Sequence, residues 1–207
     1  MTTPDPAAGQ GFTLFGDRRS GNCLKVSAVA DHLGLAYRWH EVDILAGESR
    51  TAAFLALNPM GQVPAVRFAD GRTLAQSNAI IRHLARGSDL LPDDPYAQAQ
   101  VDEWLFWEQY SHEPYIAVCR FHMLYQGRPA DAREPWRVER GEAALDLMER
   151  RLAERPWLVG DGATVADAAL LAYTRLAHEG GFDLAGRPAV RAWIDRAQAA
   201  LGLTAVA

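Results

Sequence analysis

The stretch FTLFGDRRSGNCLKVSAVADHLGL, residues 12–35, decides the fold that we predict for this chain. It begins with a short, mainly apolar run, residues 12–15, that a Gly-Asp pair ends, which is typical of a buried strand. From Cys23 onward, apolar residues recur at helical spacing as far as Gly34, and glycine is the residue expected just past a helix end. The tetrad SGNC at 20–23 therefore lies in a strand-to-helix turn.

This turn has a chemical and a structural interpretation. Backbone N–H groups and the positive end of the helix dipole meet at a helix N-terminus, so a hydroxyl and an amide placed there can stabilise an anion. Ser20 and Asn22 supply these two groups. Ser20 is equally a good helix N-cap, and Asn22 is ordinary turn material. The turn alone leaves both interpretations open.

The amino-acid composition limits the classes of function that this chain can have. The 207 residues are 49% hydrophobic and 23% charged, which indicates a globular chain of one large or two small domains. A net charge of −5 without a Lys/Arg tract argues against a nucleic-acid partner. No apolar run is long enough to span a membrane, and residues 1–10 are not signal-like. We expect a cytoplasmic chain with a mobile tail at residues 1–10.

The cysteine content agrees with the expectation of a cytoplasmic chain. Cys23 and Cys119 are too few for a disulfide framework of a secreted protein. No group of Cys and His residues has the spacing of a zinc site. We therefore expect no metal.

Residues 11–86 alternate between strand and helix patterns. A second strand is expected within 35–42, followed by a loop and a short helix. Residues 61–68 resemble a strand, but Pro64 cannot donate to a ladder, so it marks an edge, a strand beginning or a cis bond. An Asp-Gly hairpin signal and a helix opened by Gln76 complete the order β-α-β-α-β-β-α.

Residues 87–95 are rich in turn-forming residues and mark a linker. The pattern after them is helical, so we predict an all-α second domain at 96–207. It opens with a long aromatic helix over about 96–125. Pro114 lies inside this helix, and a proline there removes a hydrogen bond and predicts a kink.

Three more helices are predicted in the second domain. One covers about 130–154. The next runs to about residue 178 and begins at Thr164, which forms a capping-box pattern with Asp167. The last ends near residue 201, and Pro188 suits its first turn.

Four motifs in chain order give this sequence a family resemblance. They are the tetrad, NPMGQVP at 58–64, QSNAI at 76–80 and TVAD at 164–167. With these motifs the chain resembles a cytosolic glutathione transferase, similar to bacterial members with Ser or Thr plus Asn in the active-site turn. The resemblance implies a thioredoxin-like domain that binds glutathione, an all-α domain that contacts a hydrophobic second substrate, and a homodimer.

The resemblance implies that Ser20 and Asn22 are the catalytic pair, hydrogen-bonded to the glutathione sulfur. A thiol with a pKa of about 8.5 is only a few per cent ionised at neutral pH, and lowering that pKa by about 2 units takes about 2.7 kcal/mol. One hydroxyl hydrogen bond to a charged acceptor contributes roughly 1.5–3 kcal/mol. Ser20 and the helix N-terminus therefore suffice without a general base.

Further positions match the part of the family pattern that holds the tripeptide, in addition to Ser20. They are Gln62, Val63, Pro64, Gln76 and Ser77. Arg50 is a further candidate, because a cation in this acidic protein would favour the anionic tripeptide. The Val63 backbone is expected to bond glutathione like an added strand, next to a cis bond at Pro64. Gln76 and Ser77 would hold the γ-glutamyl carboxylate at a helix N-terminus. Glutathione is thus the expected co-substrate, with no prosthetic group.

Aromatic residues of the long helix predict an apolar second-substrate site. Residues four apart share a helix face, so Phe106 and Tyr110 are the candidates for the electrophile pocket. Large aromatics at helical spacing usually pack against other residues, so we expect Trp104 and Trp107 in the core or in interdomain packing. His112 is expected to be a satisfied or exposed histidine.

Two other functions remain open at this stage. Ser20 and Cys23 have the spacing of a thioredoxin-type C-x-x-C whose first cysteine is replaced, so a glutathione-dependent disulfide or hydroperoxide reductase is the main alternative. The helical spacing of Cys23 with its apolar neighbours favours a buried core cysteine over a reactive thiol. A non-catalytic ligand-binding or partner-binding member of the fold is the other alternative.

Overall fold

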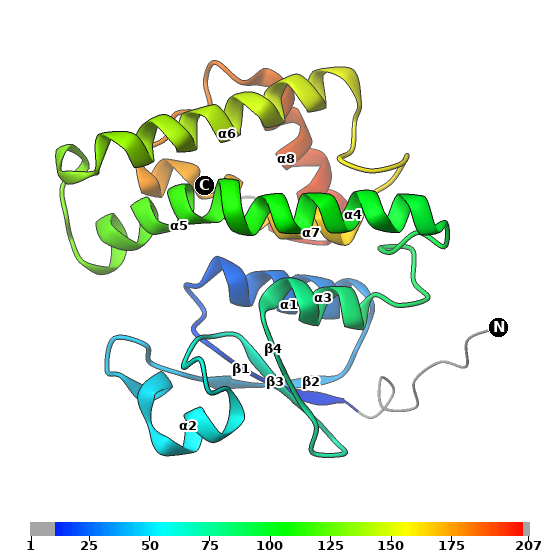
Figure 1. Cartoon of the computed structure of the whole chain (residues 1–207). Coiled ribbons are helices and arrows are strands. Elements are labelled where there is room, and N and C mark those ends of the chain that lie inside the picture. The colour runs from blue at the N-terminus through cyan, green and yellow to red at the C-terminus, as the bar shows by residue number, and fades with distance from the viewer. Residues whose placement is uncertain (1–10, 205–207) are drawn as a thin grey trace. The chain divides into compact units, whose positions relative to one another are not determined.

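The computed structural model describes residues 11–204, so the predicted tail at residues 1–10 lies outside the described part. The chain divides into two compact units, the first ending at Leu91 and the second beginning at Pro92. The first unit combines a sheet with helices and the second is helical (Figure 1). The predicted fold class is confirmed.

The first unit has the predicted order of strands and helices. Its elements are β1 (Phe12–Gly16), α1 (Gly21–His32), β2 (Tyr37–Glu41), α2 (Ala52–Leu57), β3 (Ala65–Phe68), β4 (Thr73–Ala75) and α3 (Ser77–Leu84). The strands form one mixed sheet in the order β2-β1-β3-β4, in which β1 is parallel to β2 and antiparallel to β3. The Asp-Gly signal is confirmed as the hairpin between β3 and β4.

The two faces of this sheet are covered differently, because successive side chains of a strand point to opposite faces. Helices α1 and α3 lie on one face, and α2 lies on the other (Figure 1). Leu14 and Val66 are fully buried on the α1/α3 face. Under α2, Phe54 packs in a cluster with Ala65 and Phe15.

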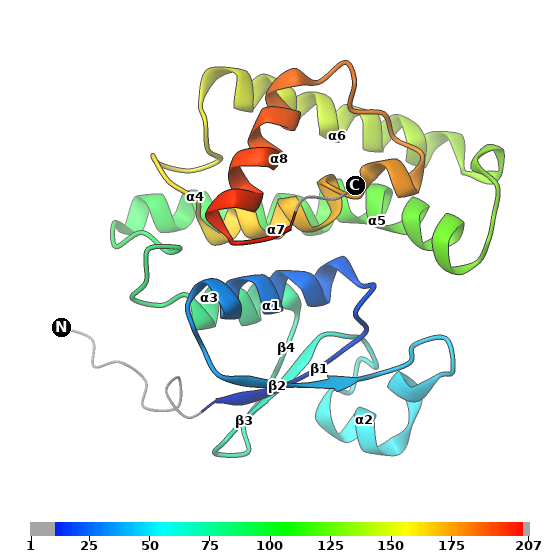
Figure 2. The same ribbon diagram turned by 180° about the vertical axis from the view of Figure 1, so that it is seen from behind.

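The second unit is built from helices. They are α4 (Pro95–Trp107), α5 (Glu113–Arg120), α6 (Pro135–Glu154), α7 (Val165–Thr174) and α8 (Pro188–Ala200). Helix α7 contacts both α4 and α8, which lie on either side of it in Figures 1 and 2. All ten residues of α7 are buried, as expected of a helix that is apolar on every side.

The long aromatic helix differs from the prediction. Instead of one kinked α-helix over 96–125, π-helical turns at Glu108–His112 and Phe121–Tyr125 flank α5. The first of these turns comes directly before Pro114. Proline has no N–H to donate to the carbonyl four residues earlier, so the helix widens in that turn.

The next helix begins later than predicted. It starts at Pro135 and not near residue 130, because proline suits the first helical position and its predecessor must be extended. Residues Ala130–Ala132 form a separate 3-10 turn. The helix predicted to reach residue 178 ends at Thr174, and a 3-10 turn, Ala177–Gly180, follows it. The first turn of α8 has Pro188, as predicted.

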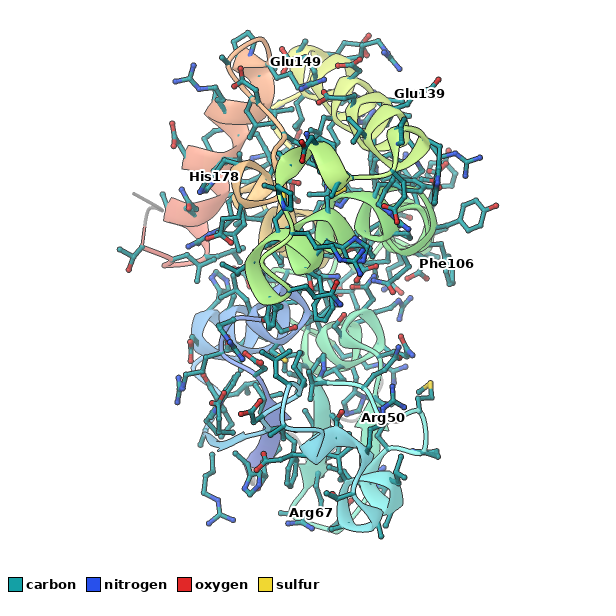
Figure 3. All side chains as sticks on the ribbon, turned by 90° about the vertical axis from the view of Figure 1, so that its left-hand side faces the viewer. Arg50, Arg67, Phe106, Glu139, Glu149 and His178 are labelled. Carbon is teal, nitrogen blue, oxygen red and sulfur yellow. The ribbon has the colours of Figure 1, made fainter. Side chains whose placement is uncertain are left out.

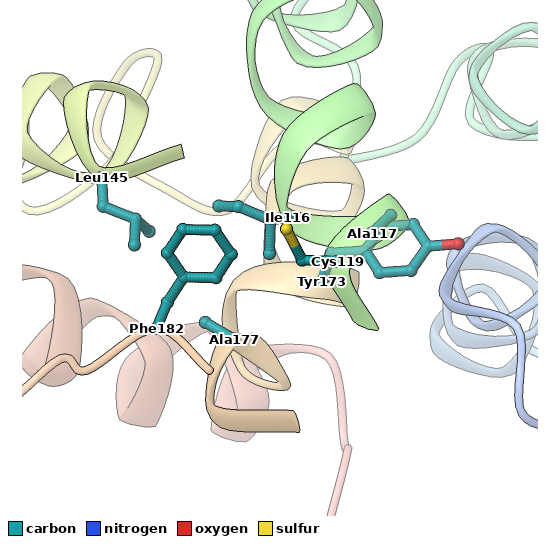
Figure 4. Packing of buried hydrophobic residues seen from close by; sticks show 7 residues of the cluster. All are labelled: Ile116, Ala117, Cys119, Leu145, Tyr173, Ala177 and Phe182. Atoms are coloured by element: carbon teal, nitrogen blue, oxygen red, sulfur yellow. The ribbon is translucent and has the colours of Figure 1, made fainter. Parts of the chain in front are cut away.

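The core of the second unit centres on one ring. Phe182 packs among Leu145, Ile116 and Ala177 from three different segments (Figure 4). A Cβ at Gly141 would lie 2.5 Å from this ring, so α6 needs a glycine where the ring meets it. None of the helices in residues 11–204 has the length and hydropathy that crossing a membrane requires.

Candidate active site

Ser20 occupies the N-cap position of α1 but does not cap it with its side chain. Its backbone is extended, with φ −77° and ψ 122°, and its carbonyl accepts hydrogen bonds from the N–H groups of Cys23 and Leu24 at 3.1 and 3.0 Å. Its hydroxyl is hydrogen-bonded to the Cys23 side chain and not to a backbone N–H. The capping interpretation of Ser20 therefore lacks the bond that defines it.

A buried carboxylate holds the turn before Ser20. Asp17 is 1% exposed and accepts a hydrogen bond from the Arg19 N–H at 2.8 Å. Its carboxylate also forms an ion pair with Arg19 Nη2 at 2.9 Å. Gly16 precedes it, and a Cβ there would lie 2.7 Å from the Cys23 sulfur. Glycine thus lets the strand end pass over the first helical turn. The sequence pattern predicted a turn at this Gly-Asp pair, but it gave no sign that the Asp17 carboxylate is buried and bound to Arg19.

The N-termini of α1 and α3 are joined by a hydrogen bond. Ser77 Oγ donates to Asn22 Oδ1 at 3.0 Å. Because the Asn22 oxygen faces Ser77, its amide nitrogen is the end directed elsewhere as a donor. A second link, which sequence reasoning missed, runs from the buried Lys25 Nζ to Asn78 Oδ1 at 3.3 Å. The structure therefore brings together the residues predicted to bind the sulfur and those predicted to bind the γ-glutamyl carboxylate.

Gln76 has an unusual backbone at the start of α3. Its φ is 68°, and among residues 11–204 it is the one non-glycine with positive φ. Such a conformation is strained for a residue with a side chain and often occurs at functional sites. Its side-chain amide donates to the Met60 sulfur at 3.3 Å, which connects α3 to the loop before β3.

The loop before β3 presents its backbone. The Val63–Pro64 peptide bond is cis, as predicted. Asn58 is 1% exposed and holds the loop, donating to the Gln62 carbonyl at 2.7 Å and accepting from the Met60 N–H at 3.2 Å. Neither the N–H nor the C=O of Val63 has a hydrogen-bond partner among the described residues. Both backbone groups of Val63 are thus available for hydrogen bonds with an added strand.

Arg50 lies at the edge of the same loop (Figure 3). Its Nη1 donates to the Met60 carbonyl at 3.3 Å, and no carboxylate of residues 11–204 pairs with it. Gly61 has φ 62°, and a Cβ at this position would lie 2.6 Å from Arg50 Nη1. The glycine therefore leaves room for a cation that the protein itself does not neutralise.

The two arginines nearest the turn are already paired. Arg19 binds Asp17, as described above. The Arg18 guanidinium lies 4.7 Å from the centre of the Trp39 ring and pairs with Glu41 at 3.5 Å. Arg50 is thus the better candidate for an anionic ligand.

Cys23 is a buried core cysteine, as its helical spacing favoured. It has no exposed surface, and burial raises the pKa of its thiol to about 12, although hydrogen bonds with Ser20 and the Asp17 backbone act in the opposite direction. A thiol with this pKa is protonated at neutral pH and is a poor nucleophile.

The second unit places the predicted aromatic residues in two settings. Phe106 and Tyr110 are 76% and 80% exposed, and Phe106 is labelled at the outer edge of its unit in Figure 3. Trp104 and Trp107 are half-buried and pack edge to face with their ring centres 5.2 Å apart. His112 is buried, and its Nε2 lies 2.9 Å from Thr174 Oγ1, so one of its two ring nitrogens has a hydrogen-bond partner. No group of three or more His, Cys, Asp and Glu side chains suited to a metal ion occurs in residues 11–204.

Comparison with known proteins gives consistent results for both units. Residues 19–86 match the family model described as the glutathione S-transferase N-terminal domain, and residues 130–196 match that of the C-terminal domain. Glutathione S-transferase 3 of Zea mays is 35% identical over 87% of this chain and 86% of its own length. A crystal structure of a glutathione S-transferase from Pseudomonas fluorescens Pf-5 is 50% identical, with a TM-score of 0.87 over 90% of this chain and 94% of that one.

A third relative has a different description. The transcriptional regulator URE2 of Saccharomyces cerevisiae is 29% identical over 84% of this chain, which spans only 61% of the regulator's length. A structure of Ure2p in complex with glutathione has a TM-score of 0.83 and 27% identity, covering 95% of this chain and 93% of that one.

Proposed function

Because this chain belongs to the glutathione S-transferase family, we propose that it activates the thiol of glutathione for attack on a hydrophobic electrophile. The observation that carries the proposal is the hydrogen bond between Asn22 and Ser77. It joins two helix N-termini, and both are places where backbone N–H groups and helix dipoles favour an anion. Glutathione needs two such places, one for the thiolate and one for the γ-glutamyl carboxylate.

Ser20 stabilises the thiolate in this proposal. Its hydroxyl is not engaged in capping α1, so it can turn from the neutral Cys23 thiol to a charged sulfur, which is the stronger acceptor. Asn22 adds an amide donor, oriented by Ser77. Both donors act mainly on the charged form of the sulfur, so they lower its pKa and raise the fraction of nucleophile at neutral pH.

The rest of the tripeptide is held by the α3 end and the loop before β3. The unpaired backbone of Val63 takes up glutathione as an added strand, with Gln62 and Pro64 on either side. Gln76 and Ser77 hold the γ-glutamyl carboxylate. Arg50 supplies a positive charge at the loop edge.

The second substrate is a hydrophobic electrophile, and Phe106 and Tyr110 are our candidates to contact it. Both rings are free of the core of their unit, so they have aromatic surface to offer. We also propose that the protein acts as a homodimer in the cytoplasm, as the family resemblance implies.

A non-catalytic role is the second candidate, because one relative is described as a transcriptional regulator. Burial keeps Cys23 protonated and out of solvent, which argues against a reductase that uses the Cys23 thiol. A reductase that uses the glutathione thiol itself remains the alternative. The two active-site helices retain Ser20, Asn22, Gln76 and Ser77, and these residues favour catalysis over binding alone.

A panel of three reactions with glutathione as the common substrate tests the proposal. The second substrates are an activated aryl chloride, a low-molecular-weight disulfide and an organic hydroperoxide. We expect conjugation to the aryl chloride to exceed the other two reactions. Faster disulfide or hydroperoxide reduction would support the reductase instead. Glutathione binding by calorimetry without turnover in any reaction would support the non-catalytic role.

A further inference from the structure

The outer face of the first unit's sheet carries a row of cations and hydroxyls. Thr13 of β1 is in register with Arg38 of β2 and with Arg67 of β3. Arg67 is in turn in register with Thr73 of β4. Residues in register share a face, so one row crosses all four strands, and we call Arg38, Thr13 and Arg67 the arginine row.

Helix α2 covers only the other end of this face. It packs over the next row, which contains Phe15 and Ala65. The arginine row is left at the open end, with Arg67 labelled near the bottom of Figure 3. A hollow of about 470 Å³ lies there, lined by the arginine row and by the strand ends Gly11–Thr13, Ala36–Arg38 and Arg67–Ala69.

Within residues 11–204, no side chain neutralises the positive charge of this hollow. Neither Arg38 nor Arg67 has a hydrogen bond or ion pair with any residue of the described chain. The Arg67 guanidinium instead lies 5.3 Å from the centre of the Phe15 ring. Two guanidinium groups thus flank one threonine hydroxyl in a protein whose net charge is −5.

The carboxylates on the neighbouring segments already have partners. Asp70, on the β3–β4 hairpin, pairs with Arg72 at 2.6 Å. Glu41, at the end of β2, accepts a hydrogen bond from the Trp39 ring N–H at 2.6 Å. Asp31 is hydrogen-bonded to the hydroxyl of Tyr37. None of these groups is left to pair with the arginine row.

The strand spacing lets both arginines reach one ligand. Arg38 and Arg67 are two strands apart, which corresponds to about 10 Å between their backbones. Their long side chains can converge above Thr13 from either side. A guanidinium is a planar fork whose parallel N–H donors match the oxygens of a phosphate, and Thr13 adds one hydroxyl.

We propose that the arginine row binds the phosphate group of a small organic molecule. The hollow is within the range of about 300–1,000 Å³ that is usual for small-molecule sites, which is more space than a phosphate alone needs. It lies at the beginning of β1, whereas Ser20 follows the end of that strand. The site is therefore separate from the glutathione site and does not depend on it.

Calorimetric titration with adenosine monophosphate tests the proposal, with adenosine as the matched compound without phosphate. We expect the monophosphate to bind with one site per chain and adenosine to show no binding. Arg38→Gln and Arg67→Gln should each weaken binding at least tenfold, and Thr13→Val should weaken it by a smaller factor. Arg86→Gln is the control, because Arg86 is an exposed arginine of the same unit that does not line the hollow; it should bind like the unaltered protein.

The outcome is independent of the transferase proposal. Glutathione conjugation should be unchanged in the Arg38→Gln and Arg67→Gln variants, since neither residue lies in the active site. Circular dichroism would verify that these variants fold, and both side chains are exposed enough to be replaced without loss of the core. The proposal is overturned if the monophosphate does not bind at millimolar concentration, if adenosine binds equally well, or if the folded Arg38→Gln and Arg67→Gln variants bind it unchanged.

Discussion

Ser20 and Cys23 face each other across the first turn of α1, and their surroundings give them opposite chemistry. Ser20 is partly exposed at the helix N-terminus, where a hydroxyl can donate to an anion. Cys23 is one turn further and fully buried, where a charge on its sulfur is disfavoured. A difference of three residues thus separates the group that we propose to stabilise a thiolate from one that stays neutral.

Replacing Ser20 by Ala should impair turnover more than glutathione binding, because the lost donor matters mainly for the charged sulfur. The pKa of the bound thiol should rise by roughly one to two units, if the bond contributes about 1.5–3 kcal/mol. Conjugation at neutral pH should fall about ten- to hundredfold, and the pH–rate profile should shift to higher pH.

Ser27→Ala is the matched control for Ser20, because Ser27 lies on the same helix and donates only to the Leu24 carbonyl. It should leave the rate and the pH profile unchanged. Ser20→Ala should also unfold at nearly the same denaturant concentration as the unaltered protein, since no capping bond is lost. An unchanged rate and pH profile in Ser20→Ala would show that Ser20 has no part in catalysis.

Cys23 should react slowly with thiol reagents in the folded protein and quickly after unfolding. Its folded pKa is about 12, against an ordinary value of 9.0. Because the folded pKa is the higher one, its contribution to stability is complete below pH 9 and is lost as the pH rises from 9 towards 12. Alkylation with iodoacetamide at pH 8, followed by mass spectrometry of the Cys23 peptide, measures this. Rapid labelling without denaturant would instead support a reactive thiol and the reductase function.

At the scale of elements, the site depends on how the loop before β3 meets α3. Met60 connects them, because its sulfur accepts from Gln76 and its carbonyl accepts from Arg50. Gly61 allows this geometry, since its φ of 62° and its lack of a Cβ leave space for Arg50. The loop and the helix end are therefore held together by Met60, and we propose that they bind glutathione jointly.

Gly61→Ala should raise the KM for glutathione, because the new Cβ would lie 2.6 Å from Arg50 Nη1 and displace the guanidinium. We expect an increase of about tenfold, the loss of one charged hydrogen bond of about 1.5 kcal/mol. Gly71→Ala is the control: its φ of 88° gives the same backbone strain, but nothing lies within 4 Å of its Cβ. Equal effects of the two substitutions on KM would show that backbone strain, and not Arg50, is responsible.

The capping box at the start of α7 was also predicted from the sequence. Asp167 Oδ2 accepts from the Thr164 N–H at 2.9 Å, and its Oδ1 accepts from the Trp193 ring N–H at 2.8 Å and the Leu158 N–H at 3.2 Å. Burial raises the pKa of this carboxyl, and the four donors around it act in the opposite direction. Asp167 thus joins the start of α7 to α8 and to the preceding loop.

Asp167→Ala should lower the free energy of unfolding by about 3–5 kcal/mol, because it removes a cap and leaves buried N–H groups without acceptors. Urea unfolding followed by circular dichroism measures this. Asp161→Ala, in the exposed loop before α7, should change it by no more than about 0.5 kcal/mol. A similarly small effect of Asp167→Ala would show that the buried network around it does not stabilise the unit.

At the scale of the whole molecule, the two units contain the candidate residues for two different substrates. The first holds every residue assigned to glutathione, and the second holds Phe106 and Tyr110. The second unit also exposes several large aromatic side chains. They are Tyr96, Phe106, Tyr110 and Trp136. Such groups of exposed apolar side chains are typical of association surfaces and binding sites.

We therefore expect a homodimer in solution. Light scattering coupled to size-exclusion chromatography at micromolar concentration should give twice the chain mass of 22.8 kDa. Glutathione should not change this mass, since its proposed site is built from residues of one chain. A single species at the chain mass would contradict the expectation.

The sequence by itself determined the order of elements, because strand and helix periodicity, turns and caps are local properties of the chain. The Asp-Gly hairpin and the Thr164 capping box were recognisable for this reason. One boundary was wrong, because the helix begins at Pro135 and not near residue 130. Ser20 and Val63 were predicted as ligand-holding positions from the motifs around them, and this stays a prediction.

Only the tertiary structure decided which of these residues meet. The bond between Asn22 and Ser77 joins positions 55 residues apart, and a hydrogen bond over that separation depends on how α1 and α3 pack on the sheet. The strained backbone of Gln76 likewise had no signal in the sequence. The arginine row exists only through strand register, because its members lie on three strands that the chain reaches at different points.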